Sequence, residues 1–225
     1  MTTGQTPLIK ASVEAADLGH LADQLQLLEE AGVDGFHFDV KDGQFIPEIS
    51  MGAMFVRGLR KYSSVPFDVH LWVDQPEPYI DSFVEAGADY LVVHFEACAN
   101  TGLALEQIRN SGCKTGVAIN PATPVSAIEP IISLCDEINV MTITPGMRGV
   151  LNKEGVENIR QAAALAAAHP HKPIVQADGA VSLKTRELIL EAGATSMVAG
   201  YPIFSREDFK AAVHDLRFGG VVPEA

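Results

Sequence analysis

Short apolar runs rich in β-branched residues recur along the chain, and amphipathic segments separate them. Eight runs have this character: residues 8–13, 35–40, 66–73, 89–95, 114–120, 137–144, 173–178 and 195–200. Each run has the length of a strand, which is usually about 4–8 residues in a buried sheet. The pattern therefore predicts eight strands with buried faces.

The segments between these runs carry the spacing of helices. Residues 17–32, 76–87 and 183–193 place apolar side chains three and four positions apart and end on a glycine suited to a left-handed helix cap. The tripeptide Glu-Ala-Gly recurs from Glu30, Glu85 and Glu191, each time just before a strand. The separations, 85 − 30 = 55 and 191 − 85 = 106 residues, are near two and four copies of one strand–helix unit.

Eight strand–helix units without a linker favour one closed barrel. The prediction is a (β/α)8 TIM barrel, an α/β fold, as a single domain over residues 1–225. An open doubly wound sheet is the alternative, but no G-x-G-x-x-G pattern follows the first strand to support it.

Composition narrows the classes of function. A net charge of -13 repels a polyanionic backbone and argues against a nucleic-acid partner, so any bound phosphate must be held locally. The three cysteines, Cys98, Cys113 and Cys135, show no CxxC spacing and predict neither disulfides nor a thiolate zinc site. The chain has no basic start followed by a long apolar stretch and no long apolar span, so we expect a cytoplasmic protein without a membrane partner.

Polar residues at the ends of three predicted strands provide candidate chemistry. His37 and Asp39 are two residues apart in GFHFDVKDG and must project to the same side of their strand. His70 and Asp178 lie near the carboxyl ends of the third and seventh strands, where barrels of this class carry their active sites. His94 alone reads as a core or rim residue.

This set of two imidazoles and two carboxylates suits one divalent metal ion such as Zn, Fe, Mn or Co, which would offset the buried charge. A metal would polarise a carbonyl and an adjacent hydroxyl of a substrate. Carboxylates on the two sides of the carbon between them could remove its proton from one face and return it to the other. The sequence thus indicates metal-assisted proton transfer beside a carbonyl.

These residues lie in motifs that resemble the ribulose-phosphate 3-epimerase family. The resemblance runs from about Ile9 to Phe204 and is strongest in HFDVKDGQFIPEISMG, DVHLWV, NPATPVSAIE, MTITPG and ADGAV. It implies a barrel of the ribulose-phosphate-binding type, one bound divalent metal and a homo-oligomer. It also implies an isomerase of the pentose phosphate part of carbohydrate metabolism, which inverts C3 of a phosphorylated ketose, such as D-ribulose 5-phosphate to D-xylulose 5-phosphate, through a 2,3-enediolate.

The resemblance also assigns roles to residues. It implies that His37, Asp39, His70 and Asp178 are the metal ligands and that Asp39 and Asp178 are the catalytic acid/base pair. The positions matched to the family's substrate-binding segments, or lying beside them, are Ser12, Lys41, Trp72, Met141, Gly146, Met147, Arg148, Gly149, Gly179, Ala180, Gly200 and Tyr201.

The chain departs from the family pattern at positions in or beside the segments that would determine substrate specificity. Glu14 replaces an apolar residue, Lys41 and Trp72 each replace a methionine, and Ala180 and Tyr201 replace a glycine and a serine. These changes favour a divergent paralogue acting on another sugar phosphate, such as a tetrulose or hexulose phosphate. They leave open whether Lys41 pairs with Glu14 or contacts the substrate.

Two further hypotheses come from other classes. One is a barrel lyase or aldolase in which Lys41 forms a Schiff base, although nearby carboxylates would raise the pKa of its amine. The other is a catalytically idle barrel that serves as a binding module, against which the presence of all four ligand-type residues argues.

Overall fold

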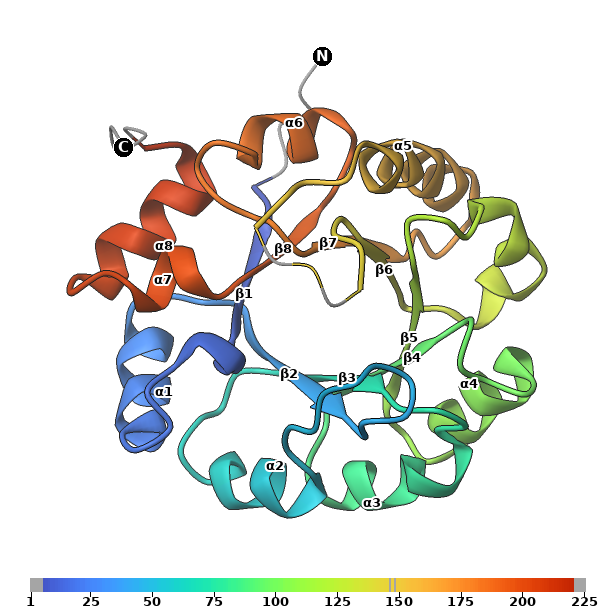
Figure 1. The fold of residues 1–225 in the computed structure, drawn as a ribbon, viewed down its shortest axis with the longest axis horizontal. Helices are drawn as coiled ribbons and strands as arrows, with labels where there is room; N and C mark the ends of the chain where they lie inside the picture. The colour runs from blue at the N-terminus through green and yellow to red at the C-terminus, as the bar shows by residue number, and fades with distance from the viewer. Residues whose placement is uncertain (1–5, 146, 148, 221–225) are drawn as a thin grey trace.

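Eight parallel strands close into a ring in the computed structural model, which describes residues 6–145, 147 and 149–220 (Figure 1). Each strand pairs with its neighbours in sequence order, and β1 pairs with β8 to complete the barrel. The strands are β1 (Leu8–Ser12), β2 (Gly35–Lys41), β3 (Phe67–Trp72), β4 (Tyr90–His94), β5 (Lys114–Ile119), β6 (Glu137–Met141), β7 (Ile174–Asp178) and β8 (Ser196–Ala199).

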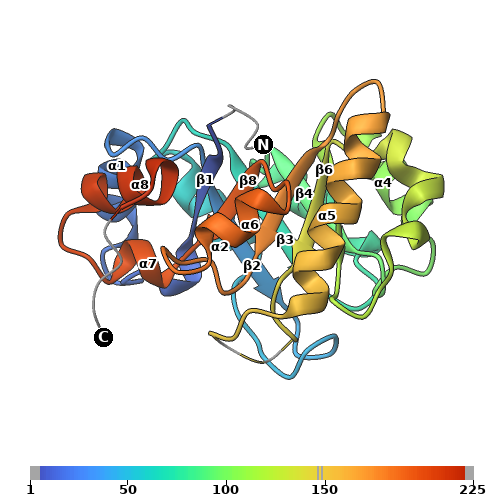
Figure 2. The ribbon, with the colours of Figure 1, turned by 90° about the horizontal axis from the view of Figure 1, so that it is seen from above.

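Helices form an outer ring around these strands (Figures 1 and 2). They are α1 (Leu21–Glu30), α2 (Ala53–Arg60), α3 (Ile80–Glu85), α4 (Thr101–Asn110), α5 (Lys153–Ala168), α6 (Arg186–Glu191), α7 (Tyr201–Phe204) and α8 (Phe209–Phe218). Short 3-10 helices η1 (Val13–Ala15) and η2 (Glu77–Tyr79) precede α1 and α3. The predicted (β/α)8 TIM barrel is confirmed.

The connection between β5 and β6 differs from the others. It contains two 3-10 helices, η3 (Val125–Ala127) and η4 (Glu129–Leu134), in place of an α-helix. Pro124 precedes the first and Pro130 lies in the first turn of the second. Proline lacks the backbone N–H that a longer α-helix needs in its interior, so this segment is divided into short turns.

Alternation along β2 divides the apolar and polar side chains as predicted. Phe36 and Phe38 are fully buried in the core between strands and helices, and both rings contact Phe67 of β3. His37 and Asp39 project to the other side, into the barrel. The β2–β3 register pairs Asp39 with His70 and so brings two chemical groups side by side.

No helix in the described part of the chain is long and apolar enough to cross a membrane.

Candidate active site and metal centre

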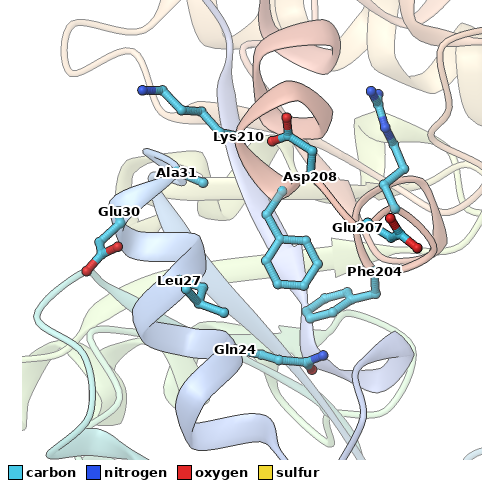
Figure 3. Close-up of a pocket in the computed structure, with 10 residues that line it drawn as sticks. Gln24, Leu27, Glu30, Ala31, Phe204, Glu207, Asp208 and Lys210 are labelled. Carbon is cyan, nitrogen blue, oxygen red and sulfur yellow. The ribbon is translucent and has the colours of Figure 1, made fainter.

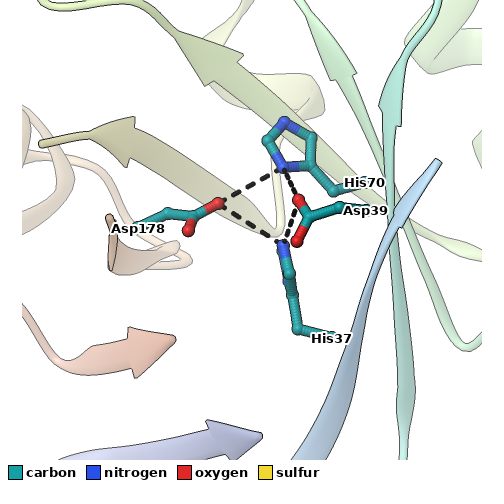
Figure 4. Close-up of side chains that lie close together, drawn as sticks. All are labelled: His37, Asp39, His70 and Asp178. Carbon is teal, nitrogen blue, oxygen red and sulfur yellow. Dashed lines mark hydrogen bonds and ion pairs between the residues drawn. The ribbon is translucent and has the colours of Figure 1, made fainter. Parts of the chain in front are cut away.

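Four side chains from three strands meet near the carboxyl ends of the barrel strands (Figure 4). His37 Nε2 lies 3.3 Å from Asp39 Oδ1 and 3.4 Å from Asp178 Oδ2. His70 Nδ1 lies 3.4 Å from Asp39 Oδ1 and 3.3 Å from Asp178 Oδ2. All four side chains are buried, and no two of these ligand-type atoms are more than 4.8 Å apart.

This donor set fits a metal ion. Two ligands of a tetrahedral zinc, each at about 2.0–2.1 Å from it, lie roughly 3.3 Å from one another, which matches the four nitrogen–oxygen distances. His37 Nδ1 is bonded to the carboxylate of Asp68, so a neutral His37 directs the lone pair of its Nε2 toward the two other carboxylates. Lone pairs so close together repel unless a cation lies among them.

The carboxylates of the site also favour a bound positive charge. Burial alone would lower the pKa of His37, but the carboxylates of Asp39, Asp68 and Asp178 raise it well above its ordinary value. Burial would raise the pKa of Asp178, yet the neighbouring His37 and His70 lower it to about 2. Burial would also raise the pKa of Asp39, but His37 and His70 lower it well below its ordinary value, so both carboxylates are available as ligands or bases.

Three neighbouring side chains hold these carboxylates in place. Trp72 Nε1 donates to Asp39 Oδ1 at 2.9 Å, and Ser12 Oγ donates to Asp39 Oδ2 at 3.2 Å. Asn139 Nδ2 donates to Asp178 Oδ2 at 3.1 Å. The sequence reasoning named Ser12 and Trp72 but missed Asn139, whose position two residues before Met141 on β6 placed it on the same inner face.

His94 is a buried residue, as interpreted, but it also forms part of the wall of the site. Its ring stacks on His70 with centroids 4.8 Å apart and an interplanar angle of 21°, and it contacts Trp72 at 4.3 Å. Burial lowers the pKa of His94 to about 4, although Glu96 Oε2 lies 3.0 Å from its Nδ1. The neutral ring therefore supports His70 by packing.

Lys41 lies at the mouth of the barrel between two carboxylates. Its Nζ is 2.7 Å from Glu14 Oε1 and 2.7 Å from Glu48 Oε2. The ion pair with Glu14 that the sequence suggested is thus present, and the loop between β2 and α2 supplies a second carboxylate. Burial alone would lower the pKa of Lys41, but both glutamates raise it, so the amine stays charged.

Apolar side chains from the β2–α2 loop cover the site. Phe45 and Ile46 pack with Trp72, Met141 and Ile143 in a small cluster separate from the main core. Met141 is only 1% exposed. This cover places apolar surface beside the four polar side chains, of which Asp39 and Asp178 keep side-chain exposures of 11% and 10%.

The candidate phosphate segments follow β6, β7 and β8. Gly179 has a φ of 101°, and a Cβ there would lie 2.6 Å from Ile143 Cγ1, so only glycine fits. The next residue, Ala180, adopts a φ of 49°. Tyr201 is 78% exposed and lies on the rim. The other candidates are Met147 and Gly149, which are exposed, Gly200, which adjoins Ser12, and Gly146 and Arg148, which lie outside the described residues.

A groove of about 720 Å³ lies elsewhere, between α1 and the segment of α7 and α8 (Figure 3). Leu27, Phe204 and Phe209 line it together with charged residues. None of the four converging side chains takes part, so the groove is separate from the candidate active site.

Fold and site together define a TIM barrel with a buried centre of two histidines and two aspartates, placed where such barrels carry out catalysis. Comparison with known proteins narrows this class. Residues 8–204 match the model of the ribulose-phosphate 3 epimerase family. The chain belongs to this family.

Two relatives illustrate the similarity. The chain is 36% identical over 211 residues to a ribulose-phosphate 3-epimerase of Bacillus subtilis, covering 93% of this chain and 97% of that protein. It is 37% identical over 214 residues to a ribulose-phosphate 3-epimerase of Methanocaldococcus jannaschii, covering 93% of this chain and 89% of that protein.

Solved structures show the same fold at lower identity. A 3-keto-L-gulonate-6-phosphate decarboxylase from Vibrio cholerae superposes with a TM-score of 0.70 at 15% identity, covering 94% of this chain and 97% of that one. A 3-hexulose-6-phosphate synthase gives 0.65 at 18% identity, covering 95% and 99%. At these identities the likeness establishes the barrel and not the reaction.

Proposed function

We propose that the protein is a metal-dependent 3-epimerase of a phosphorylated ketose that interconverts D-ribulose 5-phosphate and D-xylulose 5-phosphate. The observation that carries this proposal is the convergence of Asp39 and Asp178, from β2 and β7, on the same two imidazole nitrogens. Membership of the epimerase family supports the same activity.

The candidate metal ligands are His37, Asp39, His70 and Asp178. When bound, a divalent ion such as Zn, Fe, Mn or Co would polarise the C2 carbonyl and the C3 hydroxyl of the ketose and lower the barrier to loss of the C3 proton. Asp68 holds His37 from behind, through Nδ1, and leaves Nε2 for the ion.

The two carboxylates then serve as acid and base. One of them removes the proton from C3, and the electrons of the C3–H bond form the C2–C3 double bond of a 2,3-enediolate. The other must enter this step as a carboxylic acid, and it donates its proton to the opposite face of C3. The centre is thereby inverted, and the two residues exchange their protonation states. Trp72 and Ser12 orient Asp39, and Asn139 orients Asp178, so that each carboxylate stays on its own side.

We propose that the loops after β6, β7 and β8 bind the phosphate through residues 144–149, Gly179, Ala180, Gly200 and Tyr201. Backbone N–H groups at such loops are the usual phosphate site of this fold. A cytoplasmic homo-oligomer with a phosphorylated sugar as its ligand belongs to the same proposal, and it rests on the family resemblance.

A paralogue acting on a tetrulose or hexulose phosphate is the second candidate. The contacts at the mouth of the barrel favour this candidate. Lys41 forms ion pairs with Glu14 and Glu48, and Trp72 donates a hydrogen bond to Asp39. Glu14, Lys41 and Trp72 stand where the family pattern has apolar residues, and they alter the surroundings of the substrate hydroxyls.

The lyase or aldolase hypothesis has less support. A Schiff-base lysine needs a lowered amine pKa, whereas the pKa of Lys41 is raised and its Nζ bonds to two carboxylates. We expect borohydride with a ketose phosphate to leave no adduct on Lys41 in the mass spectrum. A stoichiometric adduct there would support the lyase instead.

Proton NMR in deuterated water tests the main proposal. With the metal-loaded protein and D-ribulose 5-phosphate, the C3–H signal should be lost as signals of the xylulose form appear, and a chelator should stop both changes. Turnover of only a tetrulose or hexulose phosphate would favour the paralogue. No exchange with any of these substrates on a protein of verified metal content would refute the epimerase.

A further inference from the structure

A second polar cluster fills the barrel one layer below the candidate metal centre, toward the amino ends of the strands. We call it the interior cluster; it consists of Lys10, Asp68, Glu137, Gln176 and Ser196, from five different strands. Each of the five is at most 3% exposed. An apolar layer would fill this space without the cost of removing charges from water. The presence of the cluster therefore indicates a role beyond packing.

Hydrogen bonds join its members into one network. Lys10 Nζ lies 2.8 Å from Asp68 Oδ2 and 2.5 Å from Glu137 Oε2. Gln176 Nε2 donates to Asp68 Oδ2 at 3.0 Å and to Glu137 Oε1 at 2.9 Å. Ser196 Oγ donates to Gln176 Oε1 at 2.8 Å, which fixes the orientation of that amide.

The network reaches the metal centre at one atom. Asp68 Oδ2, already bonded to Lys10 and Gln176, is 2.9 Å from His37 Nδ1. A carboxylate oxygen only accepts, so Nδ1 donates to Asp68. A cation that replaces the proton of Nε2 would find the lone pair of this nitrogen directed toward Asp39 and Asp178. The outer nitrogen of the other imidazole, His70 Nε2, has no hydrogen-bond partner among the described residues. The hydrogen bond to Asp68 therefore occupies Nδ1 and leaves Nε2 as the nitrogen of His37 that can bind a metal ion.

We propose that Asp68 and Lys10 are positioning residues for His37: Lys10 and Gln176 hold the Asp68 carboxylate, which in turn presents His37 Nε2 as a metal ligand. This inference rests on the metal site of the proposed function. A carboxylate behind a ligating histidine raises the basicity of the ligand and fixes its ring, and its loss typically weakens metal binding by about 10–100-fold.

Substitutions at Asp68 test the role. Asp68→Leu removes the acceptor but leaves Lys10 paired with Glu137, so the interior keeps a balanced ion pair. We expect its affinity for Zn²⁺, measured by competition with a chelating dye, to fall about 10–100-fold. Asp68→Asn keeps a carbonyl acceptor for His37 and should lie between Asp68→Leu and the unsubstituted protein.

Glu137→Gln is the matched control. It changes a buried carboxylate of the same cluster that has no hydrogen bond to His37 in the structure. Its amide oxygen can accept from Lys10, whereas its amide nitrogen cannot accept from Gln176, which keeps its hydrogen bond to Asp68. Its affinity for Zn²⁺ should stay within about threefold of the unsubstituted protein. Circular dichroism and melting curves of each metal-free variant separate loss of fold from loss of the ligand.

Nitrogen NMR of the zinc-loaded protein gives a readout independent of the affinity measurements. We expect His37 to show a protonated Nδ1 and a metal-bound Nε2, and the Nδ1 proton to shift upfield in Asp68→Asn. Equal affinity of folded Asp68→Leu and unsubstituted protein, an equal loss in Glu137→Gln, or zinc on Nδ1 would each overturn the positioning role. Failure of the unsubstituted protein to bind zinc or any other first-row divalent ion would instead refute the metal site itself.

Discussion

Two short-range rules bring the four residues of the candidate metal centre together. Side chains on a strand alternate, so His37 and Asp39 share a face, and parallel strands of a barrel end at one mouth, which brings in His70 and Asp178. Contacts across the barrel could not be predicted in this way. The bonds of Lys10 to Asp68 and Glu137 depend on the stagger of β1, β3 and β6, which no local pattern specifies.

Ala180 stores conformational strain that one substitution would relieve. Its φ of 49° costs a residue with a Cβ about 1–2 kcal/mol, against roughly 0.5–1 kcal/mol of extra chain entropy lost by glycine. Ala180→Gly should therefore raise the unfolding free energy by about 0.5–1 kcal/mol and the melting temperature by roughly 2 °C. Ala192→Gly, at a residue with φ of −71°, is the control and should lower stability. An Ala180→Gly protein less stable than the unsubstituted protein would contradict the claim that Ala180 is strained.

At the scale of elements, the β2–α2 loop connects the fold to the site. Asp42 fixes its start, because Oδ1 accepts from the backbone N–H groups of Gln44 at 2.8 Å and Phe45 at 3.0 Å, and Oδ2 accepts from that of Asp74 at 2.9 Å. The predicted strand ends at residue 40, and the strand pattern predicts no structure for the loop that follows. It did not show that the loop folds back so that Ile46 and Phe45 pack on Trp72.

Asp42→Ala should loosen this cover. Three backbone donors lose their acceptor, so we expect a loss of about 1–2 kcal/mol in unfolding free energy and a rise of several-fold in KM as the apolar side chains lose their fixed place. Asp42→Asn retains one acceptor oxygen, so its unfolding free energy and its KM should lie between those of Asp42→Ala and those of the unsubstituted protein. Chemical denaturation measures the change in unfolding free energy, and steady-state kinetics measures the change in KM. An unchanged KM in Asp42→Ala would show that the loop does not contribute to substrate binding.

For the whole molecule, regular repetition made the barrel predictable. Eight strand runs and the recurring Glu-Ala-Gly pattern specified the number and the order of the units, and closure followed from them. The β5–β6 connection departs from this regularity because its prolines interrupt helical hydrogen bonding. The same pattern implied a buried core, and burial determines the pKa and the reactivity of the cysteine thiols.

Folding buries the thiols of Cys113 and Cys135 and covers that of Cys98 in part. Burial raises the pKa of Cys98, Cys113 and Cys135 from 9.0 to about 12, with nearby carboxylates adding to the shift. The folded protein holds its thiol protons between pH 9 and 12 while the unfolded chain releases them, so this contribution to stability is complete below pH 9 and is lost as pH rises toward 12. At pH 8 we expect a thiol reagent to leave Cys113 and Cys135 unlabelled in the folded protein, to label the partly buried Cys98 slowly and to label all three in denaturant. Rapid labelling of Cys113 or Cys135 in the folded protein would contradict their burial.

The central claim is that Asp39 and Asp178 act on opposite faces of C3, and Asp178→Asn tests it most directly. An amide cannot accept or return the proton, so at saturating metal, with the metal content verified, formation of D-xylulose 5-phosphate should be abolished. Exchange of C3–H with deuterated water should persist for one of the two epimers alone, because Asp39 still acts on its own face. A folded, metal-loaded Asp178→Asn protein that epimerises at the rate of the unsubstituted enzyme would contradict the two-carboxylate mechanism.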